Sequence, residues 1–443
     1  MRKVLSVLIL LGLISAWAQP AAGQGSRLSL IRDAEIEHII RQYAEPIFQA
    51  AGINAASVDI YLVNDPRPNA FVAGGLNLFV TTGLLIQAKG ADQLLGVIAH
   101  ETGHMAGGHL ARGQEQLENA RKTAIISALL GVAAAVAAGD AGAGAAVISG
   151  GQQVAERTFL AYSRGMESAA DQAATTYLDT LGYSAEGMLS FFEQLEDQEV
   201  LEQSRQTEYV RTHPLTRDRI DFIRRHVSLS PNSGQELPVR YHDWFDRIQA
   251  KLIGFLQPQA ALQRMPDNGG IADRYGRAIA RYRRGDLQGA LAAIDSLLAA
   301  EPENPFFHEL KGQMLLEGGD PAAARSSYVR AAELYPGEST ILVPLAQTML
   351  ASGGPADLEA AVTHLRRAIA SPRGATPLAW RLLATAYGRR GEMGLAAVAL
   401  AEEALAKGDN ETARQQADRA IRELPEGSAG WLLAQDVRRA AGG

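Results

Sequence analysis

Residues 94–104 read LLGVIAHETGH, and this stretch determines the fold and the chemistry expected of the first half of the chain. Its apolar residues have the spacing of a buried helix. His100 and His104 lie one helical turn apart, about 6 Å along the axis, so both imidazoles project from one face. Two histidines at this spacing, with Glu101 between them, are typical of a zinc-binding helix whose glutamate acts as general base.

A zinc site on this helix needs a third ligand from elsewhere. A histidine at position 110 would supply it on the same helix, but that residue is Leu110, and His109 lies about 140° away from the ligand face. The other source is a glutamate on a second helix. Residues 162–171 read YSRGMESAAD, with Glu167 and Asp171 one turn apart. We predict that Glu167 binds the metal and that Asp171 orients a ligand histidine. Four alanines around this pair (Ala169, Ala170, Ala173 and Ala174) favour close helix packing.

The first residues are predicted to be a secretory signal peptide. Arg2 and Lys3 precede a short apolar run, and AWA at residues 16–18 follows as a small-x-small cleavage site. We therefore expect residues 1–18 to be removed, with cleavage near Ala18, and the mature chain to be exported.

Composition excludes several classes of function. The 443-residue chain is 47% hydrophobic and 21% charged, as expected of a folded protein rather than a disordered or polytopic membrane protein. Because there are no cysteines, disulfides, cysteine-ligated metals and thiol nucleophiles are excluded. The net charge of −7 gives no basic surface that would indicate nucleic-acid binding.

The second half of the chain repeats itself every 34 residues. The repeated landmarks are Gly285-Asp286 with Gly319-Asp320, Ala290 with Ala324, and Pro302 with Pro336. A 34-residue unit with small residues where helices cross resembles the tetratricopeptide repeat, and we expect about four units. Proline and glycine in residues 257–270 indicate a linker. The predicted domains are residues 28–265 and a repeat domain, residues 270–443, that binds other proteins.

The two metal-site motifs together resemble the HtpX and prenyl-protein (C-a-a-X) zinc protease family. With an export signal and repeats, the chain is similar to the periplasmic BepA group of that family. Further matching segments are NAF at residues 69–71, LNLFV at 76–80, HLAR at 109–112, and His213-Pro214 followed by Arg219. The expected fold is mainly α: a zincin-type α+β protease domain with a small β-sheet, followed by an α-solenoid of repeats.

The resemblance implies one Zn²⁺ per chain and assigns further roles. His213 resembles a fourth zinc ligand that displaces the catalytic water and restrains the enzyme. The open alternative is that His213 assists catalysis from the substrate side. Arg219 would support the site. An edge strand containing Asn69, Ala70 and Phe71 would bind an extended substrate through backbone hydrogen bonds.

The function that the resemblance implies is a periplasmic zinc endopeptidase, with chaperone activity, for unfolded or misassembled envelope proteins. Its repeats would dock on the outer-membrane β-barrel assembly machinery. A repeat-based chaperone or scaffold with little proteolysis is one alternative. A membrane-anchored, HtpX-like protease is another, because residues 123–138 are uncharged and apolar. We favour peripheral membrane contact or a lid for residues 123–151, since the run is short for a span.

Overall fold

The computed structural model describes residues 28–109, 163–196, 208–352 and 354–442, with a few isolated positions between residues 111 and 149. The predicted signal peptide and nearly all of residues 123–151 lie outside the described residues. Among the described residues, no helix is both long and apolar enough to cross a membrane.

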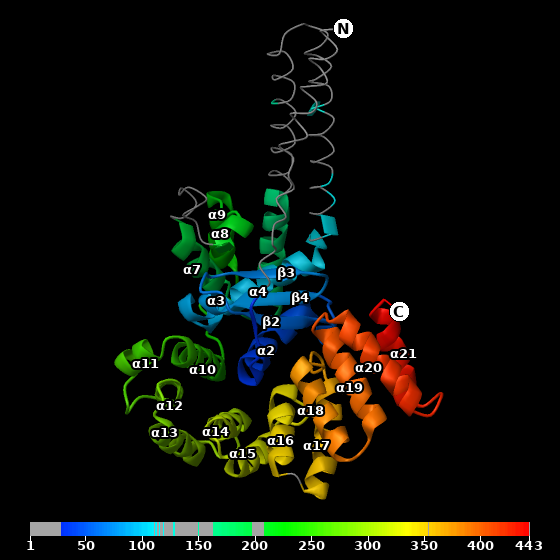
Figure 1. Ribbon diagram of the computed structural model, residues 1–443. Helices are drawn as coiled ribbons and strands as arrows, with labels where there is room; N and C mark the ends of the chain where they lie inside the picture. The colour runs from blue at the N-terminus through cyan, green and yellow to red at the C-terminus, as the bar shows by residue number, and fades with distance from the viewer. Residues whose placement is uncertain are drawn as a thin grey trace, which may run out of the picture.

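A small mixed sheet lies at the centre of the first part of the chain (Figure 1). Its strands lie in the order β1 (Leu30–Ile31), β2 (Asp59–Val63), β4 (Asn77–Thr81) and β3 (Ala70–Ala73). Strands β2 and β4 are parallel, and the other two pairs are antiparallel. Alternate residues of β2 and β4 are buried in the core, which leaves the opposite face of the sheet half-buried. In the described part of the chain β3 forms an edge of the sheet.

Helix α4 (Ala91–Ala106) is the central element of this part, because every residue from 91 to 105 except Asp92 is buried. A helix apolar on all sides is stable only when other elements surround it. The elements packed with it in one hydrophobic core are α2 (Ala34–Ala50), η1 (Ala55–Ser57), α3 (Thr82–Gln87), a helix over residues 163–180, α7 (Glu186–Leu195), α8 (Glu208–Thr212), α9 (Arg217–Leu229) and α10 (Val239–Leu256).

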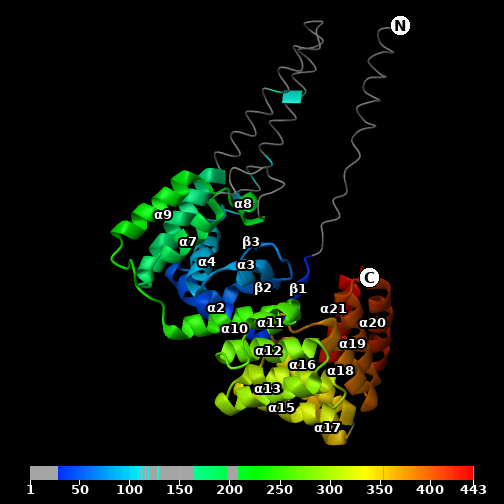
Figure 2. The same ribbon diagram turned by 90° about the vertical axis from the view of Figure 1, so that its left-hand side faces the viewer.

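The second part consists of consecutive helices that curve beneath α2 and return beside the sheet (Figures 1 and 2). After α11 (Pro258–Arg264), five helix pairs follow among the described residues. They are α12 (Ile271–Arg283) with α13 (Leu287–Ala300), α14 (Pro305–Glu317) with α15 (Pro321–Leu334), α16 (Ser339–Ser352) with α17 (Pro355–Ala370), α18 (Pro377–Arg389) with α19 (Met393–Ala406), and α20 (Asn410–Glu423) with α21 (Ala429–Ala440).

The sequence repeat has a clear local cause. Gly285 and Gly319 both adopt φ of +88°, a left-handed conformation that glycine adopts at little cost when it ends a helix. The aspartates that follow them, Asp286 and Asp320, cap the next helices by accepting hydrogen bonds from the backbone N–H three residues later. The 34-residue period therefore reflects a recurring Gly-Asp turn, at which one helix ends and the next begins.

The predicted fold class is confirmed: the chain is mainly helical, with a small mixed sheet followed by helical repeats. Some details differ. The described residues form five helix pairs rather than about four repeat units, and the expected linker contains α11. Of the four alanines expected at a helix contact, only Ala170 and Ala174 are fully buried, whereas Ala173 is half-buried and Ala169 is exposed. The predicted domain limits stay predictions.

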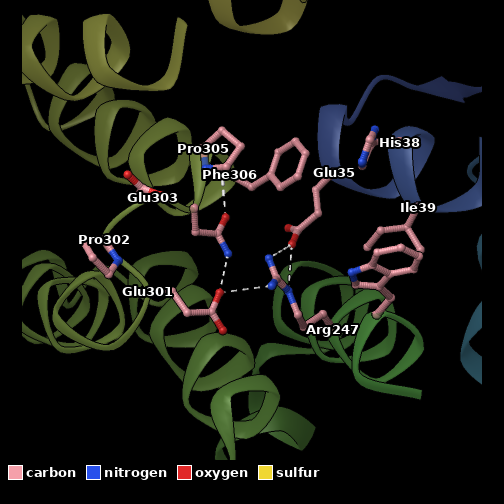
Figure 3. Close-up of a pocket in the computed structure, with 11 residues that line it drawn as sticks. Glu35, His38, Ile39, Arg247, Glu301, Pro302, Glu303, Pro305 and Phe306 are labelled. Atoms are coloured by element: carbon pink, nitrogen blue, oxygen red, sulfur yellow. Dashed lines mark hydrogen bonds and ion pairs between the residues drawn. The ribbon is translucent and has the colours of Figure 1, made fainter. Parts of the chain in front are cut away.

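The two parts meet through a buried polar cluster at the start of α2. Glu35 is 1% exposed and accepts a hydrogen bond of 2.8 Å from the Tyr275 hydroxyl of the repeats. The ammonium of Lys251 lies 3.2 Å from the same carboxylate. Figure 3 shows Arg247 between Glu35 and Glu301, paired with both. Buried charges require such pairing, so this joint fixes the repeats against α2 and α10.

Candidate metal centre

Two helices cross closely at the predicted metal-binding motif. A Cβ atom on Gly103 would lie 2.8 Å from the carbonyl oxygen of Ala170, so only glycine fits there without movement. Ala170 is fully buried at this crossing. The short approach brings the helix over residues 163–180 against α4, and with it Glu167 against His100 and His104.

Four buried side chains converge at this crossing. One ligand atom each of His100, His104, Glu167 and His213 lies within 4.8 Å of the other three. Nε2 of His100 lies 3.1 Å from Nε2 of His104, 3.3 Å from a carboxylate oxygen of Glu167 and 3.4 Å from Nδ1 of His213. The structure thus brings together the three predicted ligands and the predicted fourth.

A buried ion pair between Asp171 and Arg219 contacts the cluster on the side of His100 Nδ1. Nδ1 of His100 lies 2.9 Å from Oδ1 of Asp171, which leaves Nε2 facing the other ligands. Arg219 of α9 donates to both oxygens of Asp171, at 2.6 and 2.9 Å, and its Nη1 lies 3.0 Å from Glu167. Asp171 is fully buried, and Arg219 is 5% exposed. Both residues therefore lie against the cluster, and their supporting roles stay a prediction.

The electrostatics of the cluster favour a cation. Burial alone would raise the pKa of Glu167, but the charge of His213 and hydrogen bonds from the histidines hold it well below its usual range. Burial would likewise lower the pKa of His100, yet the carboxylates of Asp171 and Glu167 raise it to about 9. Burial lowers the pKa of His104 to about 3, so its imidazole is neutral. Glu167 is thus ionised and His104 neutral, as metal ligands must be, and a bound cation would replace the extra proton that these carboxylates favour on His100.

Glu101 lies beside the cluster without a hydrogen bond. Both of its carboxylate oxygens are buried without a hydrogen-bond partner among the described residues. Oε1 lies 3.4 Å from Nε2 of His213, in an ion-pair contact. Burial raises the pKa of Glu101, although the charge of His213 opposes the shift. A buried carboxyl that makes no hydrogen bond is costly to fold, which is typical of a group that serves chemistry.

The donor set fits a metal ion. Nε2 of His100 faces three polar atoms at 3.1–3.4 Å, but it can donate at most one hydrogen. A cation among these atoms would satisfy them together. Two imidazoles one turn apart, a carboxylate from a second helix and a third imidazole are the ligand types that divalent transition metals take.

The predicted edge strand begins beside the same site. Ala70 and Phe71 lie on β3, and Asn69 precedes it; Ala70 is fully buried. Asn69 and Thr81 are hydrogen-bonded: the Asn69 N–H donates to the Thr81 hydroxyl at 2.9 Å, and the Thr81 N–H donates to the Asn69 carbonyl at 3.0 Å. The side-chain amide oxygen of Asn69 also accepts a 3.4 Å hydrogen bond from the hydroxyl of Thr212. Thr212 immediately precedes His213 in the sequence. Whether this strand binds substrate stays a prediction.

Sequence reasoning missed two aromatic contacts of the cluster. The ring of Tyr209 stacks on His213 at 4.8 Å, and its buried hydroxyl has no hydrogen-bond partner in the described chain. Its position one turn before His213 was the only available signal. His109, which the sequence analysis placed away from the ligand face, has its Nδ1 3.0 Å from Nδ1 of His104 and so steadies a ligand histidine.

The fold and the site define a metallopeptidase in which an H-E-x-x-H helix receives a glutamate from a second helix. Comparison with known families agrees. Residues 31–227 match peptidase family M48, and residues 275–339 match the tetratricopeptide repeat. The chain therefore carries a domain of peptidase family M48, followed by tetratricopeptide repeats, as the sequence analysis predicted.

Distant relatives match this chain over much of their length. The chain is 26% identical over 365 residues to the beta-barrel assembly-enhancing protease of Yersinia pestis, covering 80% of this chain and 73% of that protein. The protein of the same name from Escherichia coli K12 is 26% identical over 290 residues, covering 63% of this chain and 58% of the relative.

Among solved structures, part of the chain matches MamA. The match has 23% sequence identity and a TM-score of 0.30, and it covers 37% of this chain and 91% of MamA.

Proposed function

We propose that this chain is an exported zinc endopeptidase that cleaves unfolded or misassembled envelope proteins. The observation that carries the proposal is the buried convergence of His100, His104, Glu167 and His213, beside a carboxylate of Glu101 that makes no hydrogen bond. A structural metal site has no need of an additional buried carboxylate that makes no hydrogen bond.

His100, His104 and Glu167 would hold one Zn²⁺ per chain. Zinc bound there supplies Lewis-acid chemistry, which polarises the scissile carbonyl and lowers the pKa of water. Asp171 keeps the proton of His100 on Nδ1, so that Nε2 is free to bind. Arg219 holds Asp171 and Glu167 in place by charge.

Glu101 would be the general base. Its buried carboxylate accepts a proton from the attacking water and then returns it to the leaving amine. Burial, which raises its pKa, brings the group closer to the pH at which both transfers are effective.

His213 would restrain the resting enzyme as a fourth ligand. Its Nδ1 lies 3.4 Å from a carboxylate oxygen of Glu167, and its Nε2 lies 3.4 Å from Glu101. The His213 imidazole fills the space between the metal ligands and the general base, Glu101. The attacking water needs that same space. Activity then requires displacement of His213, together with α8 immediately before it.

Substrates would be extended chains that pair with β3, because backbone pairing tolerates many sequences. The repeats would bind the outer-membrane β-barrel assembly machinery. The name of the relatives, beta-barrel assembly-enhancing protease, supports a partner in β-barrel assembly, and the predicted signal peptide supports a periplasmic location. Residues 123–151 would provide peripheral contact with the membrane. No nucleic acid is involved.

The direct test uses the mature chain, residues 19–443, with metal analysis and a casein-type cleavage assay. We expect one zinc per chain and cleavage that a chelator abolishes and zinc restores. Zinc-free protein with unchanged cleavage, or stoichiometric zinc without any cleavage in wild type and His213→Ala alike, would exclude the proposal.

A repeat-based chaperone with little proteolysis is the second candidate function. The position of His213 between Glu167 and Glu101 favours it, because a restrained site would be inactive most of the time. Suppression of aggregation of an unfolded β-barrel protein by the Glu101→Gln variant would identify this activity separately from cleavage.

A further inference from the structure

Three aromatic side chains form a row across the outer face of the sheet. Tyr61 of β2, Phe79 of β4 and Phe71 of β3 occupy one register level, each paired with its neighbour. The Tyr61 and Phe79 rings stack with centroids 4.8 Å apart at 12°, and the Phe79 and Phe71 rings at 4.8 Å and 5°. All three are half-buried. This aromatic row connects the strand nearest α2 with the edge strand of the site.

A residue of the repeats covers one end of the aromatic row. The guanidinium of Arg373, in the loop between α17 and α18, lies 4.8 Å from the centre of the Tyr61 ring, a cation–π contact. The same loop approaches α2: the Arg373 carbonyl accepts a 2.8 Å hydrogen bond from Arg32, and its side chain pairs with Glu37. Its side chain is only 20% exposed.

The backbone of Arg373 is strained. Its φ of +56° makes it the only non-glycine residue with positive φ among those the structure describes. Such a conformation persists only where surrounding contacts hold it, and it is found preferentially at functional positions. Here Arg32, Glu37 and Tyr61 supply those contacts.

The other end of the aromatic row is Phe71, one residue from the buried Ala70. Strand β3 has four residues and, among the described residues, pairs only with β4. A short strand with one neighbour is prone to local opening. Its pairing with β4 and the Phe71–Phe79 stack are therefore important for keeping β3 extended.

We propose that Arg373 is a positioning residue for substrate binding: it fixes the aromatic row and thereby keeps β3 extended beside the metal centre. This inference rests on the proposed function, because it assumes that substrate pairs with β3. A strand that is already extended loses less conformational entropy when a substrate pairs with it. Loss of the Arg373 contact therefore weakens binding of extended substrates and leaves the chemical step unchanged.

The test compares Arg373→Ala with Arg373→Lys and with a control, Arg325→Ala, which removes an ion pair to Asp357 elsewhere in the repeats. For a long peptide substrate, KM should rise about 3- to 10-fold in Arg373→Ala, with kcat within about twofold, on the scale of one cation–π contact. Arg373→Lys should restore part of the loss, since it keeps a cation near the ring. The control should match wild type.

Hydrogen exchange of the backbone amides at residues 70–73 is the second readout, and it needs no cleavage. Exchange should be faster in Arg373→Ala and unchanged in Arg325→Ala. Tyr61→Leu should speed it as well, and adding Arg373→Ala to Tyr61→Leu should have little further effect. Unchanged exchange in a folded Arg373→Ala protein would overturn the inference. If the wild-type protein cleaves no substrate while amide exchange in the variants changes as expected, the proposed function fails but the positioning role of Arg373 stands.

Discussion

Gly103 of α4 and Ala170 of the following helix lie so close that a Cβ atom on Gly103 would be 2.8 Å from the Ala170 carbonyl oxygen. This contact sets the distance between the helix that carries the two histidines and the helix that carries Glu167. The metal centre therefore depends on a glycine that has no ligand atom of its own.

The first prediction follows from this contact. Gly103→Ala should destabilise the fold by about 1–3 kcal/mol through overpacking against backbone, although alanine favours helix more than glycine does. Zinc affinity should fall with it, because Glu167 moves away from His100 and His104. Chemical denaturation and zinc titration measure both effects.

The matched control is Gly165→Ala on the same helix as Ala170, where an added Cβ meets nothing within 4 Å. There the change should be neutral or stabilising by up to about 1 kcal/mol. A stable Gly103→Ala protein with normal zinc affinity would show that the close crossing is not required.

The second prediction concerns the pair behind the ligands. Asp171→Asn should lower zinc affinity roughly 10- to 100-fold, because the neutral amide no longer fixes His100 or balances Arg219. Asp221→Asn on α9, at an exposed ion pair with Arg224, is the control and should have little effect. Equal zinc affinity for the two variants would remove Asp171 from the site.

The third prediction addresses restraint by His213. His213→Ala should raise basal proteolysis, including self-cleavage, because the space beside Glu101 becomes open to water. His242→Ala, at an exposed position of α10, should leave activity unchanged. The restraint hypothesis fails if His213→Ala has lower activity with full zinc content, since that outcome assigns His213 to the substrate side.

The fourth prediction is a pH dependence at the joint between the two parts. Burial raises the pKa of Glu309 on α14 to about 7, even though the ammonium of Lys251 opposes the shift. The carboxylates of Asp33 and Glu35 raise it further. Because the unfolded carboxyl has a pKa near 4.3, the folded state binds the extra proton between about pH 4 and 7. This contribution to stability is therefore lost as pH rises through that window.

Thermal unfolding of wild type and Glu309→Gln tests whether this contribution to stability falls as pH rises. The variant should gain stability over wild type at about pH 8 and show little difference at about pH 5. Glu303→Gln, whose side chain is 83% exposed, should show no such change. A constant difference between wild type and Glu309→Gln across the pH range would contradict the prediction.

How far the sequence predicts this structure depends on how local each feature is. The spacing of His100 and His104 fixes their geometry within one helix, and the 34-residue repeat follows from helix ends at Gly285 and Gly319. The two-histidine arrangement and the repeat could therefore be predicted directly from the sequence. Glu167 required a second sequence pattern, because nothing local relates it to α4.

Long-range contacts could not be predicted in this way. The hydrogen bond from Arg32 to the carbonyl of Arg373 joins residues 341 positions apart, and no periodicity connects them. Tyr209 contacts His213 within one turn, but a tyrosine at that spacing is more often an ordinary core residue. Such contacts depend on how helices pack together, which a single sequence does not specify.

The most direct test of the central claim measures zinc content and peptide cleavage together in wild type and Glu101→Gln. Gln has nearly the same shape but cannot accept the proton of the attacking water. The proposed mechanism predicts one zinc per chain in both proteins, and cleavage reduced by roughly 10²–10⁴-fold or more in the variant. Cleavage by Glu101→Gln at the wild-type rate, with zinc retained, would contradict it.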